Sequence, residues 1–230
     1  IRVKSDKYMS PIGEQKYLAL CEGASAMSGI SSCLGRNGIG YYAMRGLPLN
    51  AYDSTMQKIV ANAELKDIVN ILSLDITKSD TTKTMSFEKV LITTDADADG
   101  AHITSMLIGW FKKFSPNLFN EGKICKLITP NIILEDTKGK IVKYFMNLTE
   151  FKKWEATNQG NKHKIVYLKG LGSWDRQQLI ELIDTNGLEN FILEYHLDKD
   201  GEVYIEDWLG SDPETRKKYL REYTLDINQI

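Results

Sequence analysis

Three aspartates stand at alternate positions near the middle of the chain. Asp95, Asp97 and Asp99 follow the apolar, β-branched run 89–94, which is typical of a buried strand. Beyond them, apolar residues recur at three- and four-residue steps as far as Phe114, which predicts a helix with one buried face. Ligands bind at the carboxyl ends of strands in open α/β sheets. Because clustered carboxylates repel one another, these aspartates favour a cation, and their hard oxygen atoms suit Mg²⁺, with Mn²⁺ as an alternative.

The same aspartates admit three other interpretations. A calcium-binding EF-hand loop also begins D-x-D-x-D-G, but it requires a glutamate at its twelfth position, where this chain has Met106. A phosphatase with Asp95 as an aspartyl nucleophile remains an alternative, although that class predicts Thr or Val where Asp99 stands. Asp97 and Asp99 can also cap the following helix, which accounts for one or two of the carboxylates but not for a third.

A second strand ends on an acid in the same way. Residues 16–21 are mainly apolar and lead to Glu22. Gly23 then permits a sharp turn, and we expect Ser25 to cap the helix that follows. Glu22 thus occupies the strand-end position that Asp95 has in the later unit. If the two strands are neighbours in a parallel sheet, both acids lie on one edge.

Strands alternate with helices over the first 136 residues. A third strand is predicted at 39–44, a helix in two pieces within 54–74, and an exposed polar loop at 75–86. Alternation of this kind predicts an α/β fold in which helices flank a parallel sheet. We therefore expect a core domain over residues 1–136 and a C-terminal tail region, 137–230, packed on it.

The tail region has an α+β pattern without an acid cluster of its own. We expect a hairpin over 134–145, a helix at 149–157, a strand at 164–168, a helix at 174–183 and then an acidic end. Its tryptophans lack regular spacing and flanking basic residues, so they indicate core or partner contacts instead of a surface on which bases stack.

The composition is that of a soluble globular protein. The 230 residues are 42% hydrophobic and 26% charged with a formal net charge of −2, so any surface for nucleic acid must be a local patch. Cys21, Cys33 and Cys125 lack paired C-x-x-C spacing, which indicates a reducing, intracellular setting without a zinc site. No apolar run is long enough to cross a bilayer, and no signal segment begins the chain. Because the first residue is Ile1, we expect an excised domain or a processed product.

Four short motifs follow one another along the chain. They are E-G-A-S-A at 22–26, R-G-L-P-L-N at 45–50, T-D-A-D-A-D-G-A-H-I at 94–103 and Y-L-K-G-L-G-S at 167–173. In this order they resemble the Toprim region of type IIA DNA topoisomerases: the gyrase B subunit, eukaryotic topoisomerase II and the large subunit of the T-even phage enzyme. The likeness runs from about Gly13 to the C-terminus and implies a Toprim (Rossmann-like) sheet. Ala24 and Leu47 depart from the family pattern, which usually has Asp and Lys there, and we expect a phage-like member.

The resemblance implies Mg²⁺-dependent cleavage and religation of double-stranded DNA, in which a tyrosine attacks a phosphate and the 3′ oxygen leaves. It implies that Glu22, Asp95 and Asp97 bind the metal and that Asp99 lies slightly farther out. It also makes Glu22 catalytic, as the group that moves the proton of the 3′ oxygen. The residues that the resemblance places against DNA are Arg45, Asn50, His102 and Lys169.

Two parts of such an enzyme are not recognisable in the sequence. None of the eleven tyrosines has the context of the family's nucleophile, and neither a Walker loop nor the G-x-G box of the family's ATPase domain occurs. We expect a partner chain or missing segment to supply the tyrosine, and a separate ATPase domain to hydrolyse ATP. The chain alone is then incomplete. Its expected location is the cytoplasm or nucleoid, or the host cytoplasm for a phage protein, and a non-catalytic DNA-docking scaffold is the remaining alternative.

Overall fold

The computed structural model describes residues 6–46, 48–78, 80–158, 160 and 162–222. Its centre is a six-stranded sheet in the order β1-β3-β2-β4-β5-β9. The four inner strands are parallel, and the two edge strands run antiparallel to their neighbours. The strands are β1 (Tyr8–Met9), β2 (Ile12–Cys21), β3 (Asn37–Ala43), β4 (Lys89–Thr93), β5 (Ile124–Leu127) and β9 (Ile192–Glu194). The predicted α/β fold with a mainly parallel sheet is confirmed.

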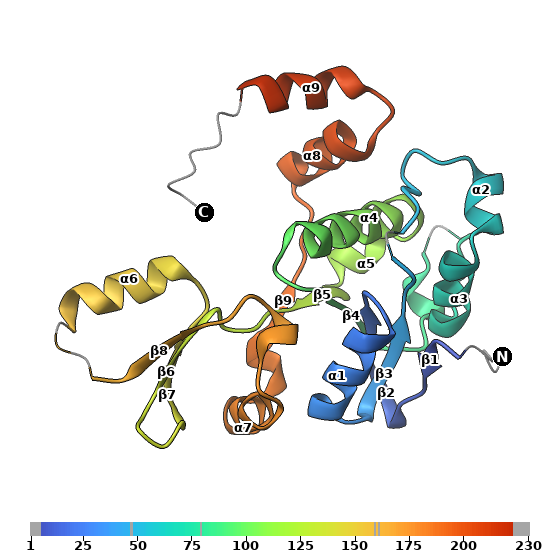
Figure 1. Ribbon diagram of the computed structural model, residues 1–230. Helices are drawn as coiled ribbons and strands as arrows, with labels where there is room; N and C mark the ends of the chain where they lie inside the picture. The colour runs from blue at the N-terminus through green and yellow to red at the C-terminus, as the bar shows by residue number, and fades with distance from the viewer. Residues whose placement is uncertain (1–5, 47, 79, 159, 161, 223–230) are drawn as a thin grey trace.

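Helices cover both faces of this sheet, as Figure 1 shows. Successive side chains of a strand point to opposite faces, so Leu18 and Leu20 pack in one core cluster while Ala19 and Cys21 pack in the other. Burial on both faces explains why the inner strands read as continuous apolar runs. The first face is covered chiefly by α3 (Ala63–Leu72) and α4 (Ala98–Phe114), and the second by α1 (Ala24–Leu34) and α7 (Arg176–Asn186).

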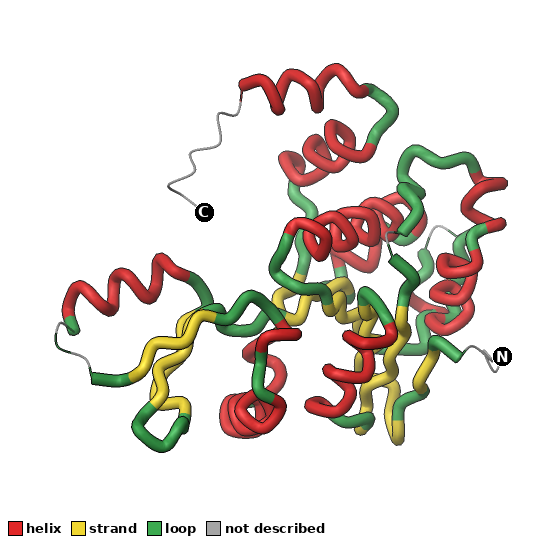
Figure 2. Tube along the Cα trace, in the orientation of Figure 1, coloured by secondary structure: helices red, strands yellow, loops and turns green. Residues whose placement is uncertain are grey.

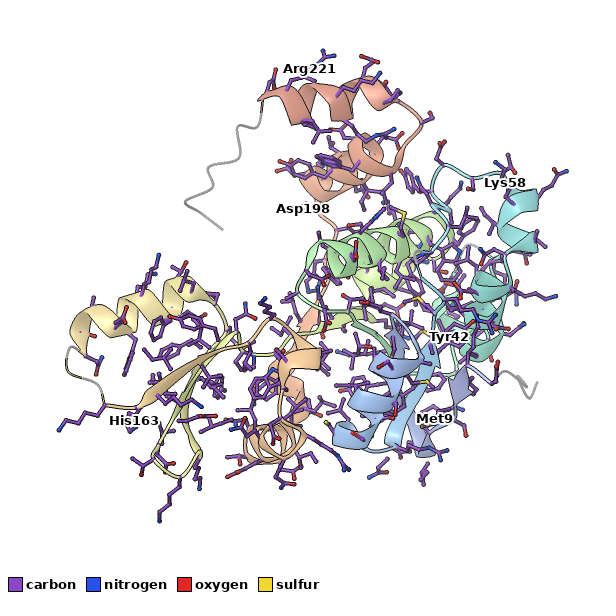
Figure 3. The ribbon with its side chains drawn as sticks, in the orientation of Figure 1. Met9, Tyr42, Lys58, His163, Asp198 and Arg221 are labelled. Atoms are coloured by element: carbon purple, nitrogen blue, oxygen red, sulfur yellow. The ribbon has the colours of Figure 1, made fainter. Side chains whose placement is uncertain are left out.

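The connection between β3 and β4 contains both predicted helical pieces, α2 (Met56–Ala61) and α3. Tyr42 of β3 lies against α3 and donates its hydroxyl to the Asp67 carboxylate at 2.9 Å (Figure 3). The loop expected to be exposed at 75–86 is partly buried, because it folds into the 3₁₀ turn η1 (Thr82–Thr84). Thr81 and Thr82 are consequently buried, and that expectation is wrong for these two residues.

A second, smaller sheet extends sideways from the first (Figures 1 and 2). Its strands are β6 (Ile132–Glu135), β7 (Ile141–Phe145) and β8 (Lys164–Tyr167), all paired antiparallel in the order β7-β6-β8. Between β7 and β8 lies α6 (Leu148–Thr157), whose Phe151 and Trp154 pack on Phe145. His163 precedes β8 at the outer end of this small sheet (Figure 3). The predicted hairpin, helix and strand are all present.

The C-terminal part contains more structure than an acidic end. After η3 (Leu188–Phe191), β9 pairs with β5 and so places part of the predicted tail region inside the main sheet; the division at residue 136 stays a prediction. Two helices follow, α8 (Lys199–Leu209) and α9 (Pro213–Glu222). Leu209 packs on Met106 of α4, beneath α8 in Figure 1. Within the described part of the chain, no helix has the length and apolar character needed to span a membrane.

Candidate metal and DNA site

Glu22 and the aspartates meet at one edge of the main sheet. β2 and β4 are parallel neighbours, and Cys21 pairs with Thr93 at the end of their ladder. The residues that follow these two positions therefore leave the sheet side by side. Burial raises the pKa of the half-buried Glu22 carboxyl, and the negative charges of Asp95 and Asp97 raise it further. The predicted convergence of the two strand ends is present in the structure.

The start of α1 differs from the prediction. The helix begins at Ala24, so the capping position falls on Gly23, whose extended backbone provides no side-chain cap. Ser25 is exposed inside the first turn instead of capping it, and its predicted role is wrong. Ser25 does line a cavity of about 420 Å³ that also includes Glu22 and Asp95. The first-turn N–H groups of a helix have no intrahelical partners, and in α1 no capping side chain accepts from them.

Asp97 serves as the N-cap of α4. Its Oδ1 accepts a hydrogen bond from the Gly100 backbone N–H at 2.8 Å, and the helix accordingly begins at Ala98. Asp99 lies in the first helical turn, where a negative charge complements the helix dipole. The capping interpretation is therefore correct for Asp97. Because both carboxylates are exposed, capping occupies one Asp97 oxygen and leaves the other accessible.

The turn between β4 and α4 is held by close backbone contact. A Cβ atom at Gly100 would lie 2.2 Å from the carbonyl oxygen of Asp95, so this position accepts no side chain without a shift of backbone. Beneath the turn, the hydroxyls of Thr94 and Thr104 are 2.9 Å apart, and Thr104 donates to the Gly100 carbonyl at 2.8 Å. These two buried threonines were not predicted, since a single threonine carries no spacing signal of its own.

The fourth motif closes over Asp95. The Gly172 backbone N–H donates to Asp95 Oδ1 at 3.3 Å. Gly170 has φ of 149°, a conformation that favours glycine, and a Cβ atom there would lie 3.0 Å from both Asp95 Oδ1 and the Ala96 nitrogen. The two glycines therefore allow the backbone of residues 169–173 to approach the aspartate turn closely. Sequence reasoning placed this motif in the family but did not predict the contact.

The acidic edge has the donor chemistry of a site for a hard divalent cation. Glu22 and the three aspartates offer oxygen atoms alone, and their mutual repulsion is the cause of part of the Glu22 pKa shift. As the side chains are placed, no group of three or more His, Cys, Asp or Glu residues in the described ranges is arranged to hold a metal. The residues therefore fit Mg²⁺ or Mn²⁺ in their chemistry, while full ligation requires side-chain movement at the exposed aspartates.

Comparisons with known proteins identify the domain that carries these acids. Residues 17–128 match the Toprim domain. The chain is 30% identical to DNA topoisomerase 2-alpha of Rattus norvegicus over 221 residues, which are 92% of this chain and 14% of that protein. It is 36% identical to DNA topoisomerase 2 of Caenorhabditis elegans over 169 residues, 70% of this chain and 11% of that protein. The chain carries a Toprim domain of the type II topoisomerase kind. It spans about one seventh of the rat relative's length.

A solved structure extends the likeness to the whole fold. The crystal structure of the Plasmodium falciparum topoisomerase II DNA-binding, cleavage and re-ligation domain superposes with a TM-score of 0.84 at 26% identity. The match covers 98% of this chain and 32% of that one. The small sheet and the C-terminal helices therefore belong to the same arrangement as the Toprim sheet. The phage-like origin stays a prediction, since these relatives come from animals and a protozoan.

The four residues expected to meet DNA differ in exposure and in their contacts. Arg45, His102 and Lys169 are exposed. The Arg45 backbone N–H is held by Glu64 Oε1 at 2.5 Å, which fixes the chain beside α3. Asn50 is half-buried: its Nδ2 donates to the Leu209 carbonyl at 2.9 Å, so its amide supports the end of α8. The DNA-binding roles of all four residues stay predictions.

Proposed function

We propose that this chain is the metal-binding Toprim module of a type II DNA topoisomerase, supporting Mg²⁺-dependent cleavage and religation of both DNA strands. The observation that carries the proposal is the meeting of Glu22 with Asp95 at the ends of adjacent parallel strands. Acids from two separate motifs lie together there. No positively charged side chain is among the groups that shift the pKa of Glu22. A phosphate-bearing substrate and a divalent cation would complete such an edge.

Each acid has a part in this proposal. Glu22, Asp95 and Asp97 hold the cation, and Asp99 adds negative charge at slightly longer range. When bound, a divalent cation stabilises charge on the leaving 3′ oxygen and holds the scissile phosphate. Burial and its acidic neighbours raise the pKa of Glu22, which brings this carboxyl closer to the range in which it exchanges a proton with the 3′ oxygen.

The DNA and the rest of the enzyme complete the reaction. Arg45, His102 and Lys169 offer exposed positive or hydrogen-bonding groups to DNA phosphates, and Asn50 contributes through the loop that it holds. A partner chain or another segment supplies the tyrosine nucleophile, and an ATPase domain hydrolyses ATP. The chain by itself then neither relaxes plasmid DNA nor hydrolyses ATP. Plasmid relaxation should appear after the tyrosine-bearing part and the ATPase domain are added.

Calorimetry with Mg²⁺ and Mn²⁺ tests the metal site on the purified chain. Asp95→Ala removes an acid at the centre of the edge, and we expect at least about tenfold weaker binding than in the unaltered chain. Asp184→Asn, an exposed acid on α7, is the matched control and should bind normally. Equal binding by the unaltered chain and Asp95→Ala would contradict the assignment.

Single-turnover cleavage in the reconstituted enzyme tests the catalytic role. At saturating DNA, Glu22→Gln should cleave about 10²-fold more slowly, the scale of losing one acid–base or electrostatic contribution. Its affinity for DNA should change little, because the lost group faces the metal and the leaving oxygen. Cleavage at the unaltered rate would instead favour the DNA-docking scaffold.

A further inference from the structure

The hydroxyl of Ser173 organises the turn that contacts Asp95. Ser173 Oγ accepts hydrogen bonds from the backbone N–H groups of Lys169, at 2.9 Å, and Gly170, at 3.2 Å. It donates to the Gly170 carbonyl at 2.7 Å. A serine hydroxyl has one proton to donate and two lone pairs to accept, so these three bonds use its whole capacity. The Ser173 backbone N–H also donates to the Gly170 carbonyl at 3.1 Å, in the 3₁₀ turn η2 (Leu171–Ser173), so the side chain and the backbone of Ser173 close the turn 169–173 together.

Both ends of this turn are anchored in the core. Leu168 is buried before it, and its N–H donates to the Asn131 carbonyl at 2.7 Å. Trp174 is buried after it, and Asp175 then caps α7. Only the conformation of the turn between these two anchors can therefore change. Ser173 is itself exposed, so its hydroxyl acts on the local backbone and contributes little to the apolar core.

The closed turn is in direct contact with the candidate metal ligand. The Gly172 N–H donates to Asp95 Oδ1, and Gly170 is so close that a Cβ atom there would lie 3.0 Å from Asp95 Oδ1 and 3.3 Å from its Cα. A hydrogen bond to one carboxylate oxygen fixes the plane of the carboxylate and directs the second oxygen. Loss of the Ser173 hydroxyl would leave this turn held by its backbone bonds alone, so we expect the Gly172 N–H, and with it the Asp95 carboxylate, to be held less firmly.

We propose that Ser173 is a positioning residue for the metal site, holding the Gly170–Gly172 turn against Asp95 so that the carboxylate faces the cation. The proposal rests on the proposed function, because it concerns the same acids. It gives the fourth motif a role toward the metal that is separate from any contact of the exposed Lys169 side chain with DNA.

Mn²⁺ binding followed by electron paramagnetic resonance on the purified chain tests the proposal. Ser173→Ala should weaken Mn²⁺ binding by about tenfold, the lower end of the effect of groups that orient metal ligands. Ser173→Thr keeps the hydroxyl and should restore binding. Ser105→Ala, which removes an exposed serine hydroxyl on α4 that bonds the Ala101 carbonyl, is the control and should bind normally. The unfolding midpoint of all three variants should stay close to that of the unaltered chain.

The amide resonance of Gly172 gives a readout that does not depend on metal. It should shift in both Ser173→Ala and Asp95→Asn and stay in place in Ser105→Ala. Normal Mn²⁺ binding by Ser173→Ala, with binding lost in Asp95→Asn, would overturn the role of Ser173 and leave the metal site standing. Normal binding by Asp95→Asn would overturn both. A loss in Ser173→Ala that came with a lower unfolding midpoint and was not restored by threonine would assign Ser173 to stability alone.

Discussion

Glu22 and Glu135 lie in two regions of the molecule and carry the same chemical group, but the pKa of the carboxyl is shifted in opposite directions. At the edge of the main sheet, burial and neighbouring aspartates raise the pKa of Glu22. In the small sheet, hydrogen bonds from Lys164 and Gln178 lower the pKa of Glu135. Lys164 Nζ lies 2.8 Å from Glu135 Oε2, and Gln178 Nε2 donates to Oε1 at 2.7 Å. The charge of Glu135 is thus balanced by a lysine of the protein, whereas Glu22 lies beside further negative charges.

The two regions also differ in what holds them together. In the small sheet, side chains make the contacts: Phe145, Phe151 and Trp154 pack ring against ring, and Glu135 links the sheet to α7. At the acidic edge, the contacts are made by backbone: the chain approaches Asp95 closely at Gly100 and Gly170, and the N–H groups of Gly100 and Gly172 donate to Asp97 and Asp95. The acids of the acidic edge are thus supported by backbone groups, whereas Glu135 is supported by side chains.

The largest effect is expected from a substitution that breaks the backbone contact at the acidic edge. Gly100→Ala would place a methyl group 2.2 Å from the Asp95 carbonyl oxygen, and we expect a loss of about 3 kcal/mol in the free energy of unfolding. Gly29→Ala, in the middle of α1 with open space around its Cα, is the control. That change should be neutral or stabilise by up to about 1 kcal/mol. Urea denaturation measures both, and equal stabilities would show that the turn yields without strain.

The acidic edge was predictable from sequence because its signals are local. An apolar run that ends on an acid and a glycine identifies both strand ends, and the parallel sheet then brings Glu22 to Asp95. The predicted cap at Ser25 was wrong, since Gly23 in an extended conformation takes the capping position and the helix starts two residues earlier. Fraying and capping at a helix terminus depend on single hydrogen bonds that a pattern of residue types does not determine.

The parts that were not predicted depend on contacts between distant residues. β9 has three residues, too few for a period, and it forms a strand because β5 leaves an edge to which it pairs. Gly172 meets Asp95 across 77 positions, and Gln178 meets Glu135 across 43. These pairs consist of ordinary polar groups whose type and spacing indicate no partner. The pairing is therefore known only from the folded structure.

A smaller effect concerns the paired acid of the small sheet and depends on pH. The folded pKa of Glu135 lies below its ordinary value of 4.5, so its contribution is present above the unfolded pKa and is lost as the pH falls through the folded pKa. Glu135→Gln removes this charge, and we expect a loss of about 1–2 kcal/mol near pH 7. The difference from the unaltered chain should shrink as the pH falls below 4.5.

Denaturation at a series of pH values measures this difference. Glu155→Gln, an exposed acid on α6, is the matched control and should leave the free energy of unfolding unchanged at every pH. If Glu135→Gln differed from the unaltered chain by the same amount at pH 7 and at pH 3, loss of packing and not of charge would be the cause. The contrast drawn between Glu135 and Glu22 would then lose its electrostatic basis.

The smallest expected effect compares one lysine from each region. Both lysines are exposed, but Lys164 pairs with Glu135, whereas Lys169 lies in the turn beside Asp95. Lys169→Ala should remove one phosphate contact from DNA binding, which lowers the slope of log affinity against log salt by about 0.9. At physiological salt, that slope corresponds to roughly fivefold weaker binding. Lys164→Ala should leave both the slope and the affinity unchanged, because Glu135 already neutralises this lysine.

Fluorescence anisotropy with one duplex across a salt series measures both variants. Equal slopes for the two variants would show that Lys169 does not contact the DNA backbone. The difference between the two regions would then lie in their carboxylates alone.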